Sequence, residues 1–373
     1  MDTMKKNNNH LFSDLLFFVP LACLFFLSHF TYFNLTSDTD VFGYYAYLEF
    51  FSFWRSLKPI FLLLLIIKIY FYSGYSVKQL TAIGLALIVI FCLCSKYHPN
   101  YFLLFAVASC FAAKNVAYCL IAKVYYYLSL CTLALTFFFL ACGLLVDNTI
   151  QRGEHLRHSF GLVHPNSFGM WSLLIIIYFI QYKQISLKNY HFVVLAFQAI
   201  TVYIFSNSRA SFFLSIMVIA LSFLFTKANH RMSQLALSFL LIAAISLAFI
   251  WLLLCYCYDS QSVWITSLDQ MVSGRIRFSH NALNDWPPNI FGNNVTFSYP
   301  VDPLFTYTLI IYGYFGLATF LSMFYIGIIR TFRKSLPFVM VAFLAFQIYN
   351  TQENVFLYHL FDLTLFTVTC DLD

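Results

Sequence analysis

Arginines placed at the edges of apolar segments are the residues best suited to chemistry in this sequence. The stretch from residue 152 to 169 holds Arg152 and Arg157 with Glu154, His158 and His164, and it leads into an uninterrupted apolar run. A guanidinium offers a planar fork of donors that fits phosphate oxygens in pairs. Histidine and glutamate are common proton carriers. This set predicts a site that holds an anionic group beside a group that accepts a proton.

Two further polar segments also bring arginine to the ends of apolar runs. A short turn, Ser206-Asn-Ser208-Arg209-Ala-Ser211, separates two apolar segments. A longer segment begins with Ser273-Gly-Arg275-Ile-Arg277 and continues past His280 to Asp302. Charged groups at membrane depth are costly and are functional candidates for that reason.

The apolar run after the first stretch starts with His164-Pro165-Asn166. Proline is preorganised for the first turn of a helix, and a helix N-terminus attracts anions. The alternative is that His164 only caps this helix.

Composition excludes a water-soluble protein. The 373 residues are 61% hydrophobic and 10% charged, with a mean hydropathy of +0.77, whereas soluble domains carry about 25% charged residues. Apolar runs of about 17 to 25 residues recur, each long enough to cross the bilayer as a helix. The sequence predicts an all-α polytopic membrane bundle of about 12 transmembrane helices, with a range of 10–13.

The predicted spans are residues 11–32, 59–72, 79–94, 97–113, 123–146, 166–182, 190–205, 210–225, 233–257, 303–329, 336–349 and 355–370. The segment 41–54 is either a thirteenth span or an interfacial amphipathic helix. We expect one integral membrane domain over 1–373. It is made of N-terminal helices (11–146), a polar loop (147–165), central helices (166–257), a large polar loop (258–302) and C-terminal helices (303–370).

The cations predict the orientation, because short cytoplasmic loops accumulate lysine and arginine. With both termini cytoplasmic, the inner side carries thirteen cations, of which three are arginine. The two long polar loops then face outward, and that side holds eight cations, six of them arginine: Arg55, Lys58, Lys96, Arg152, Arg157, Arg209, Arg275 and Arg277. An arginine excess on the cation-poor side predicts an anionic ligand, and interfacial anchoring is the alternative.

The ordered set of motifs resembles the Wzy-type polysaccharide polymerases and the related O-antigen ligases. The resemblance covers residues 152–316, and the first 145 residues add only a compatible number of spans. Its parts are Ser159-Phe-Gly-x-x-His-Pro-Asn166, Ser206-x-Ser-Arg209, Ser273-Gly-Arg275, Ile290-Phe-Gly292 and Tyr312-Gly-x-x-Gly316.

This resemblance implies glycosyl transfer between two undecaprenyl-pyrophosphate-linked oligosaccharides at the outer face of a bacterial cytoplasmic membrane. A hydroxyl of one repeat unit attacks the anomeric carbon of the growing chain, and undecaprenyl pyrophosphate leaves. The family uses no nucleotide sugar, cofactor or metal. A flippase and a chain-length regulator are the partners implied, and the scattered cations do not favour nucleic acid.

The leaving pyrophosphate gathers charge in the transition state, so preorganised cations should contribute most to catalysis. Arg157, Arg209 and Arg275 match the family's motif positions and are the predicted catalytic arginines. The predicted substrate-binding residues are Arg152, Asn166, Ser208, Arg277, His280 and Asp302.

The base that takes the acceptor's proton is open among Glu154, His158, His164, His280, Asp302 and Glu353. We favour His164, with Glu154 as second choice. In the related ligases a loop histidine is implicated, and His280 lies in a comparable loop.

Two other functions remain open. A ligase would share the donor site but attach finished polymer to a second acceptor. A transporter or flippase of lipid-linked sugars would place ionisable groups near the bilayer midplane. Asp362 is the exception among helix centres that are almost free of charge. The ten cysteines lie mostly in apolar runs and are predicted to be buried thiols.

Overall fold

The computed structural model describes residues 2–30, 33–34, 56–97, 101–228, 230–295, 297–299, 301–353 and 362–372. The chain folds into two compact units that alternate along the sequence. Unit 1 contains Met1–Gly74, Ala112–Ala228 and Asp373, and unit 2 contains Tyr75–Phe111 and Asn229–Leu372.

Seven helices in the described part of the chain have the length and apolar composition to cross a membrane. They contain the spans Leu11–Phe30, Val77–Ser95, Tyr118–Ala141, Asn189–Ser206, Arg209–Lys227, Ser233–Tyr256 and Gly313–Arg333. Two shorter apolar helices are Leu103–Ala112 and Pro337–Asn350. The protein is therefore helical and embedded in a membrane with several passes, as the composition predicts. A total of twelve spans and cytoplasmic termini stay predictions.

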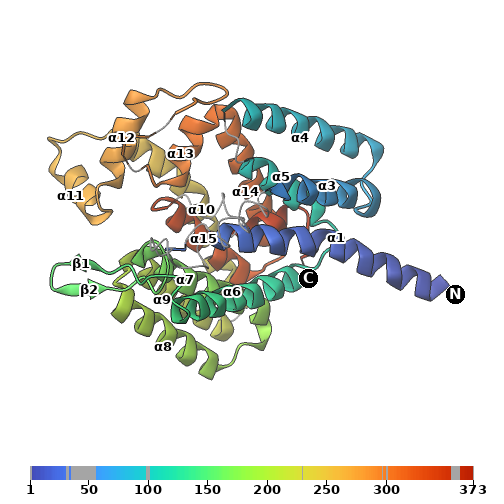
Figure 1. Ribbon diagram of the computed structural model, residues 1–373, viewed down its shortest axis with the longest axis horizontal. Coiled ribbons are helices and arrows are strands. Elements are labelled where there is room, and N and C mark those ends of the chain that lie inside the picture. Colours follow the sequence, from blue (N-terminus) through green and yellow to red (C-terminus); the bar gives the residue numbers. More distant parts are fainter. Residues whose placement is uncertain are drawn as a thin grey trace. The chain divides into compact units, whose positions relative to one another are not determined.

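Unit 1 is a helical bundle arranged around one central helix. Its helices are α1 (Asp2–Phe30), α3 (Lys58–Ile67) with a π-helical extension (Lys68–Tyr72), α6 (Tyr118–Ala141), α7 (Pro165–Lys183), α8 (Asn189–Ser206) and α9 (Arg209–Lys227). The central helix α7 packs against α6, α8 and α9 (Figure 1). It buries side chains on all sides, which is the pattern of a helix enclosed by others.

Aromatic contacts join α1 and α7 in the core of unit 1. The ring of Trp171 lies 4.2 Å from that of His29 and 5.6 Å from that of Phe25, both in edge-to-face geometry. His29 Nε2 is 2.8 Å from the hydroxyl of Thr136 on α6. Aromatic pairs of this geometry contribute about 0.5–1.5 kcal/mol each beyond burial. The three helices are thus held at a defined depth relative to one another.

Unit 2 has a second buried helix at its core. Its elements are α4 (Val77–Tyr97), α5 (Phe102–Ala112), α10 (His230–Tyr256), α11 (Val263–Met271), α12 (Arg275–Asp285), α13 (Leu304–Ile311), α14 (Gly313–Arg333), α15 (Pro337–Asn350) and a 3-10 helix η3 (Leu363–Val368). Helix α15 packs against α10 and α14, and nearly all its side chains are buried. The segment predicted as the large polar loop, 258–302, contains the helices α11 and α12.

The predicted single helix over 303–329 is broken at Tyr312, and the prediction of one continuous span is wrong there. Gly313 has φ +69°, and α14 starts at this residue. The loop around Asn289 fills the break, because the amides of Tyr314 and Phe315 donate to the carbonyl oxygens of Asn289 and Ile290 at 3.0 Å. The groups freed by the break are therefore satisfied by protein.

The predicted span 355–370 also differs. Its described part is the short 3-10 helix η3, which Asp362 caps by accepting from the amide of Thr364 at 2.9 Å. Six residues of this kind are too short to cross a bilayer. The rest of that span, 355–361, and the segment 41–54 lie outside the described residues, as does Arg55.

Candidate functional site

The polar stretch after α6 folds as a β-hairpin. Strand β1 (Ile150–Arg152) pairs antiparallel with β2 (His155–Arg157), and Arg152 lies opposite His155. Gly153 occupies the first position of the two-residue loop with φ +62°, which glycine adopts without strain. The hairpin therefore carries both arginines of the stretch on one short element.

Arg157 attaches this hairpin to the helices. Its Nε donates to the carbonyl oxygen of Ser206 at 2.8 Å, and its Nη2 donates to Oδ1 of Asn166 at 2.6 Å. One residue further, the backbone amide of His158 donates to the carbonyl oxygen of Phe205 at 2.9 Å. The hairpin, the first turn of α7 and the last turn of α8 thus meet at one end of unit 1.

The turn between α8 and α9 lies at the same end. Asn207 takes the left-handed conformation there, with φ +44°. The small polar residues of the turn are buried, and the hydroxyl of Ser208 donates to that of Ser211 at 3.2 Å. Gly169 of α7 allows the close approach, since a Cβ at this position would meet Ser208 Oγ at 2.6 Å.

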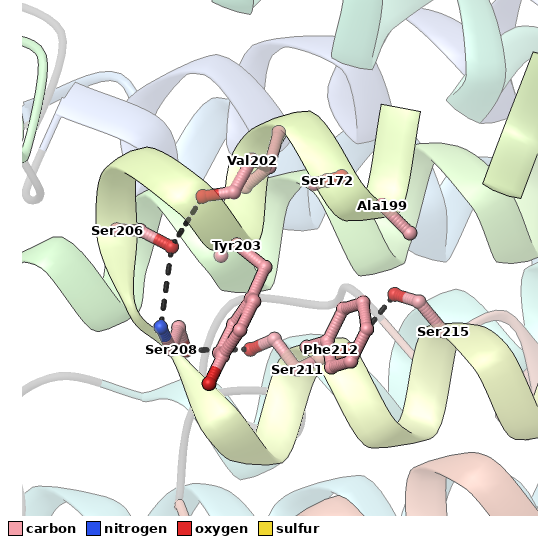
Figure 2. Close-up of a pocket in the computed structure, with 10 residues that line it drawn as sticks. Ser172, Ala199, Val202, Tyr203, Ser206, Ser208, Ser211, Phe212 and Ser215 are labelled. Atoms are coloured by element: carbon pink, nitrogen blue, oxygen red, sulfur yellow. Dashed lines mark hydrogen bonds between the residues drawn. The ribbon is translucent and has the colours of Figure 1, made fainter. Parts of the chain in front are cut away.

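A small, half-open pocket lies between α7, α8 and α9 beside this turn (Figure 2). Serine hydroxyls and two aromatic rings line it: Ser172, Ser206, Ser208, Ser211, Ser215, Tyr203 and Phe212. The rings of Tyr203 and Phe212 stack with centroids 4.4 Å apart. The pocket provides polar groups at a depth where the neighbouring side chains are apolar.

Three arginines form what we call the guanidinium cluster: Arg152, Arg157 and Arg209. Burial, and then the charges of Arg152 and Arg209, lower the pKa of Arg157. Arg157 is only 5% exposed, whereas Arg209 is exposed. No ion pair within the described residues joins a carboxylate to any of the three. Like charges held together without counter-charges create a site for an anion.

Lysines gather at the opposite end of unit 1. Lys183 ends α7, Lys188 precedes α8, and Lys227 ends α9. The ammonium groups of Lys123 and Lys183 both lie over the ring of Tyr182, at 5.9 and 4.6 Å from its centroid. Helices of 18 or 19 residues separate the two ends, a length of about 28 Å that matches the hydrocarbon layer.

The favoured base, His164, caps α7. Its Nδ1 accepts from the amide of Asn166 at 3.0 Å. A ring nitrogen that accepts in this way carries no proton, so the neutral ring keeps its proton on Nε2. That tautomer presents a donor and not a base. Glu154, the second choice, lies exposed at the tip of the hairpin.

Arg275 is neutralised within unit 2. Its Nη2 lies 2.8 Å from Glu353 Oε1 and 3.5 Å from Asp302 Oδ2, and its Nε donates to the carbonyl oxygen of Gln352 at 2.5 Å. Partial burial raises the pKa of Asp302, and Arg275 opposes this effect. A guanidinium with two carboxylate partners has little charge left for a diphosphate, so this arrangement favours a structural role.

Two other predicted residues of unit 2, Arg277 and His280, lie on α12. The start of α12 is capped by Asp269, whose Oδ1 accepts from the amides of Ile276 and Arg277 at 3.0 Å. Arg277 is exposed and its guanidinium lies 5.3 Å from the centroid of the Phe278 ring. His280 contacts Cys255 O through Nδ1 and Asn284 Nδ2 through Nε2, both at 2.9 Å.

The sequence reasoning did not single out Asp147. One oxygen of this carboxylate lies 2.6 Å from His158 Nδ1, and the other accepts from the amides of Ser159 and Phe160 at 2.8 and 2.7 Å. The pairing expected across a hairpin is the feature that could have identified Asp147 from the sequence. Ile150 lies opposite Arg157, and the same register continued outward places Asp147 opposite Phe160, beside the residues that follow β2.

The structure thus brings Arg152, Arg157, Arg209, Asn166 and Ser208 to one end of unit 1, and it joins Arg275 with Asp302 in unit 2. In the described part of the chain, no group of three His, Cys, Asp or Glu side chains gathers that could hold a metal ion. Comparison with known proteins found no matching family model, no matching curated protein and no matching solved structure.

Proposed function

We propose that this protein is a membrane glycosyltransferase that joins undecaprenyl-pyrophosphate-linked repeat units into a surface polysaccharide at the outer face of the bacterial cytoplasmic membrane. The guanidinium cluster carries the proposal. Three arginines that have no carboxylate partner among the described residues lie at one end of unit 1, and lysines lie at the other. Lysine accumulates on the cytoplasmic side, so the cluster belongs to the outer side.

The chemistry of the cluster fits a departing diphosphate. Arg157 is fixed by Ser206 and Asn166 before any ligand arrives, and cations held in place in this way stabilise developing charge without reorganising. The exposed Arg209 and the half-exposed Arg152 can then contact phosphate oxygens from the surface. The motif resemblance supplies the reaction class, and of the three predicted catalytic arginines the geometry favours Arg157 and Arg209 over the ion-paired Arg275.

A reconstituted assay tests the function directly. Purified protein in proteoliposomes receives a single lipid-linked repeat unit extracted from the host's membranes, and the products are separated by size. A polymerase yields a ladder. Transport of the repeat unit without lengthening would replace this proposal by a flippase. Transfer of finished polymer to a second acceptor, without a ladder, would replace it by a ligase.

Substitution of Arg157 or Arg209 by lysine tests the site. Each variant should lower the rate of ladder formation by about 10²-fold, in line with the loss of one charge-stabilising donor. Arg333→Lys is the matched control, because Arg333 is exposed near the end of α14 and far along the chain from the cluster. Full activity of both the Arg157 and Arg209 variants would remove the cluster from the mechanism.

A further inference from the structure

Asp147 and His158 form a carboxylate–imidazole pair at the base of the hairpin. The 2.6 Å contact between Asp147 Oδ2 and His158 Nδ1 is short enough for a strong hydrogen bond. Asp147 accepts as well from the amides of Ser159 and Phe160, so the carboxylate is held from a second direction. An acceptor-only carboxylate places the ring proton on Nδ1 and leaves Nε2 with its lone pair.

Nε2 of His158 is available to a ligand. The side chain of His158 is 33% exposed. Its ring contacts Asp147 and lies beside Phe160, with centroids 5.7 Å apart, and Nε2 meets no partner among the described residues. His164 and His280, by contrast, use a ring nitrogen to cap a helix or to bridge two elements.

His158 directly follows Arg157 of the guanidinium cluster in the chain. The amide of His158 donates to Phe205 O and the Nε of Arg157 donates to Ser206 O, so consecutive residues of the hairpin are fixed to consecutive carbonyls at the end of α8. A proton acceptor and a diphosphate-binding cation are therefore held on one rigid segment. This is the arrangement that a base and a leaving-group site need.

From this geometry we infer that His158 is the catalytic base of the proposed reaction and that Asp147 is its positioning residue. The inference rests on the proposed function. His158 Nε2 takes the proton of the acceptor hydroxyl as that oxygen forms a bond to the anomeric carbon of the donor. The bond from that carbon to the diphosphate oxygen breaks, and the diphosphate leaves with the electron pair to the guanidinium cluster. The imidazolium, stabilised by Asp147, then releases its proton to water.

The test compares ladder formation by wild-type protein, His158→Gln, His158→Ala and Asp147→Asn in proteoliposomes across pH. His158→Gln should lower the rate by about 10²-fold or more, the usual contribution of a positioned base. Binding of undecaprenyl pyrophosphate to the same variant should change less than twofold. Added imidazole should restore part of the activity of His158→Ala, which a purely structural histidine would not allow.

The dependence of activity on pH separates the role of His158 as a base from the role of Asp147 in positioning it. The ionisable groups on the elements around the ring are Asp147, Glu154 and His155 with the three arginines of the cluster. Wild-type activity should fall in acid as the imidazole takes a proton, and this limb should be absent in His158→Gln. Asp147→Asn should lower the rate and keep this limb, because the ring loses its positioning carboxylate but keeps its basic nitrogen.

His191→Gln is the matched control, since the Nδ1 of His191 is also held by a hydrogen bond, in its case from the amide of Lys188, but the residue lies at the lysine end of unit 1. If the wild-type protein forms a ladder and His158→Gln keeps both the rate and the loss of activity in acid, the base assignment is overturned and the proposed function stands. A loss of undecaprenyl pyrophosphate binding in His158→Gln as large as its loss of rate would also overturn the base assignment. Wild-type protein that forms no ladder would overturn the proposed function, and the base assignment would fall with it.

Discussion

Arg157 of the hairpin donates a hydrogen bond to the carbonyl oxygen of Ser206 in the last turn of α8. The last carbonyls of a helix have no partner within the helix, so they need one from elsewhere. Here a buried guanidinium supplies it and uses a second nitrogen for Asn166 at the start of α7. One side chain therefore fixes the position of a surface hairpin relative to two membrane helices.

Replacing Arg157 by lysine should weaken diphosphate binding. An ammonium group cannot reach both Ser206 and Asn166 in the planar geometry of the guanidinium. We expect about a tenfold increase in the Kd for undecaprenyl pyrophosphate, which equals about 1.4 kcal/mol. Binding in nanodiscs measures this change, with Arg333→Lys as the control. An unchanged Kd would show that the hairpin does not need Arg157 to hold the anion.

The ion pairs of Arg275 should affect stability. Arg275→Gln leaves Glu353 and Asp302 without their cation, and their side chains are only 20% and 39% exposed. We expect a loss of about 1–3 kcal/mol in the free energy of unfolding, as for other part-buried charges that lose a partner. Unfolding in detergent measures it.

Arg277→Gln is the control, because Arg277 lies exposed on the same helix with its guanidinium over the ring of Phe278. The double variant Arg275→Gln with Glu353→Gln should lose less than the sum of the two single changes. Strict additivity would mean that these charges do not stabilise each other.

Gly292→Ala should be far more damaging than Gly143→Ala. Both glycines have positive φ, +88° and +73°, so alanine strains the backbone at either position. Only at Gly292 would the new Cβ collide with protein, namely the carbonyl oxygen of Ile311, whereas Gly143 has nothing within 4 Å. Thermal unfolding should show a loss of about 1 kcal/mol for Gly143→Ala and several-fold more for Gly292→Ala. Equal losses would show that the loop is not locked into the break between α13 and α14.

The contribution of Asp147 should depend on pH. Burial alone raises its pKa, but the hydrogen bonds from His158, Phe160 and Ser159 outweigh burial, and the pKa in the fold is lowered. A carboxylate whose pKa is lowered by folding stabilises the fold at any pH above its pKa in the unfolded chain. It loses that effect as the pH falls through its pKa in the folded protein.

The unfolding midpoint of Asp147→Asn should therefore lie below that of the wild type at pH 6. The difference should shrink below about pH 4, near the ordinary pKa of aspartate. Scans in detergent from pH 7 to pH 3 measure the trend. A difference that stays constant over this range would assign the effect to shape and not to charge.

The sequence predicted most helices well because long apolar runs allow one conformation in lipid. The core of unit 1 from α6 to α9 follows the predicted spans within a few residues. The break at Tyr312 could not be predicted in this way. Glycine, the residue type at positions 313 and 316, also occurs inside uninterrupted membrane helices. Only the docking of the Asn289 loop, far away in the chain, decides the conformation there.

The candidate site was predicted in its residue types and only partly in its grouping. Arg157 and Arg209 meet because a turn and a hairpin converge at the end of α8. Arg275 has the same local pattern of serine, glycine and arginine, yet Glu353, 78 residues further on, neutralises it. Charge pairing over such separations depends on tertiary folding, which composition and spacing do not encode.

Helix α7 illustrates a hazard in counting passes through the bilayer. It runs beside α8 and α9 and starts at the hairpin end, but its neighbours enclose it so fully that Ser172 and Gln181 are buried in protein. A helix without lipid contact need not be uniformly apolar, and α7 is absent from the seven helices whose length and composition suit a membrane span. A count of passes made from those seven alone leaves α7 out, and reporter tags in the loops before and after α7 would show on which side of the bilayer each of its ends lies.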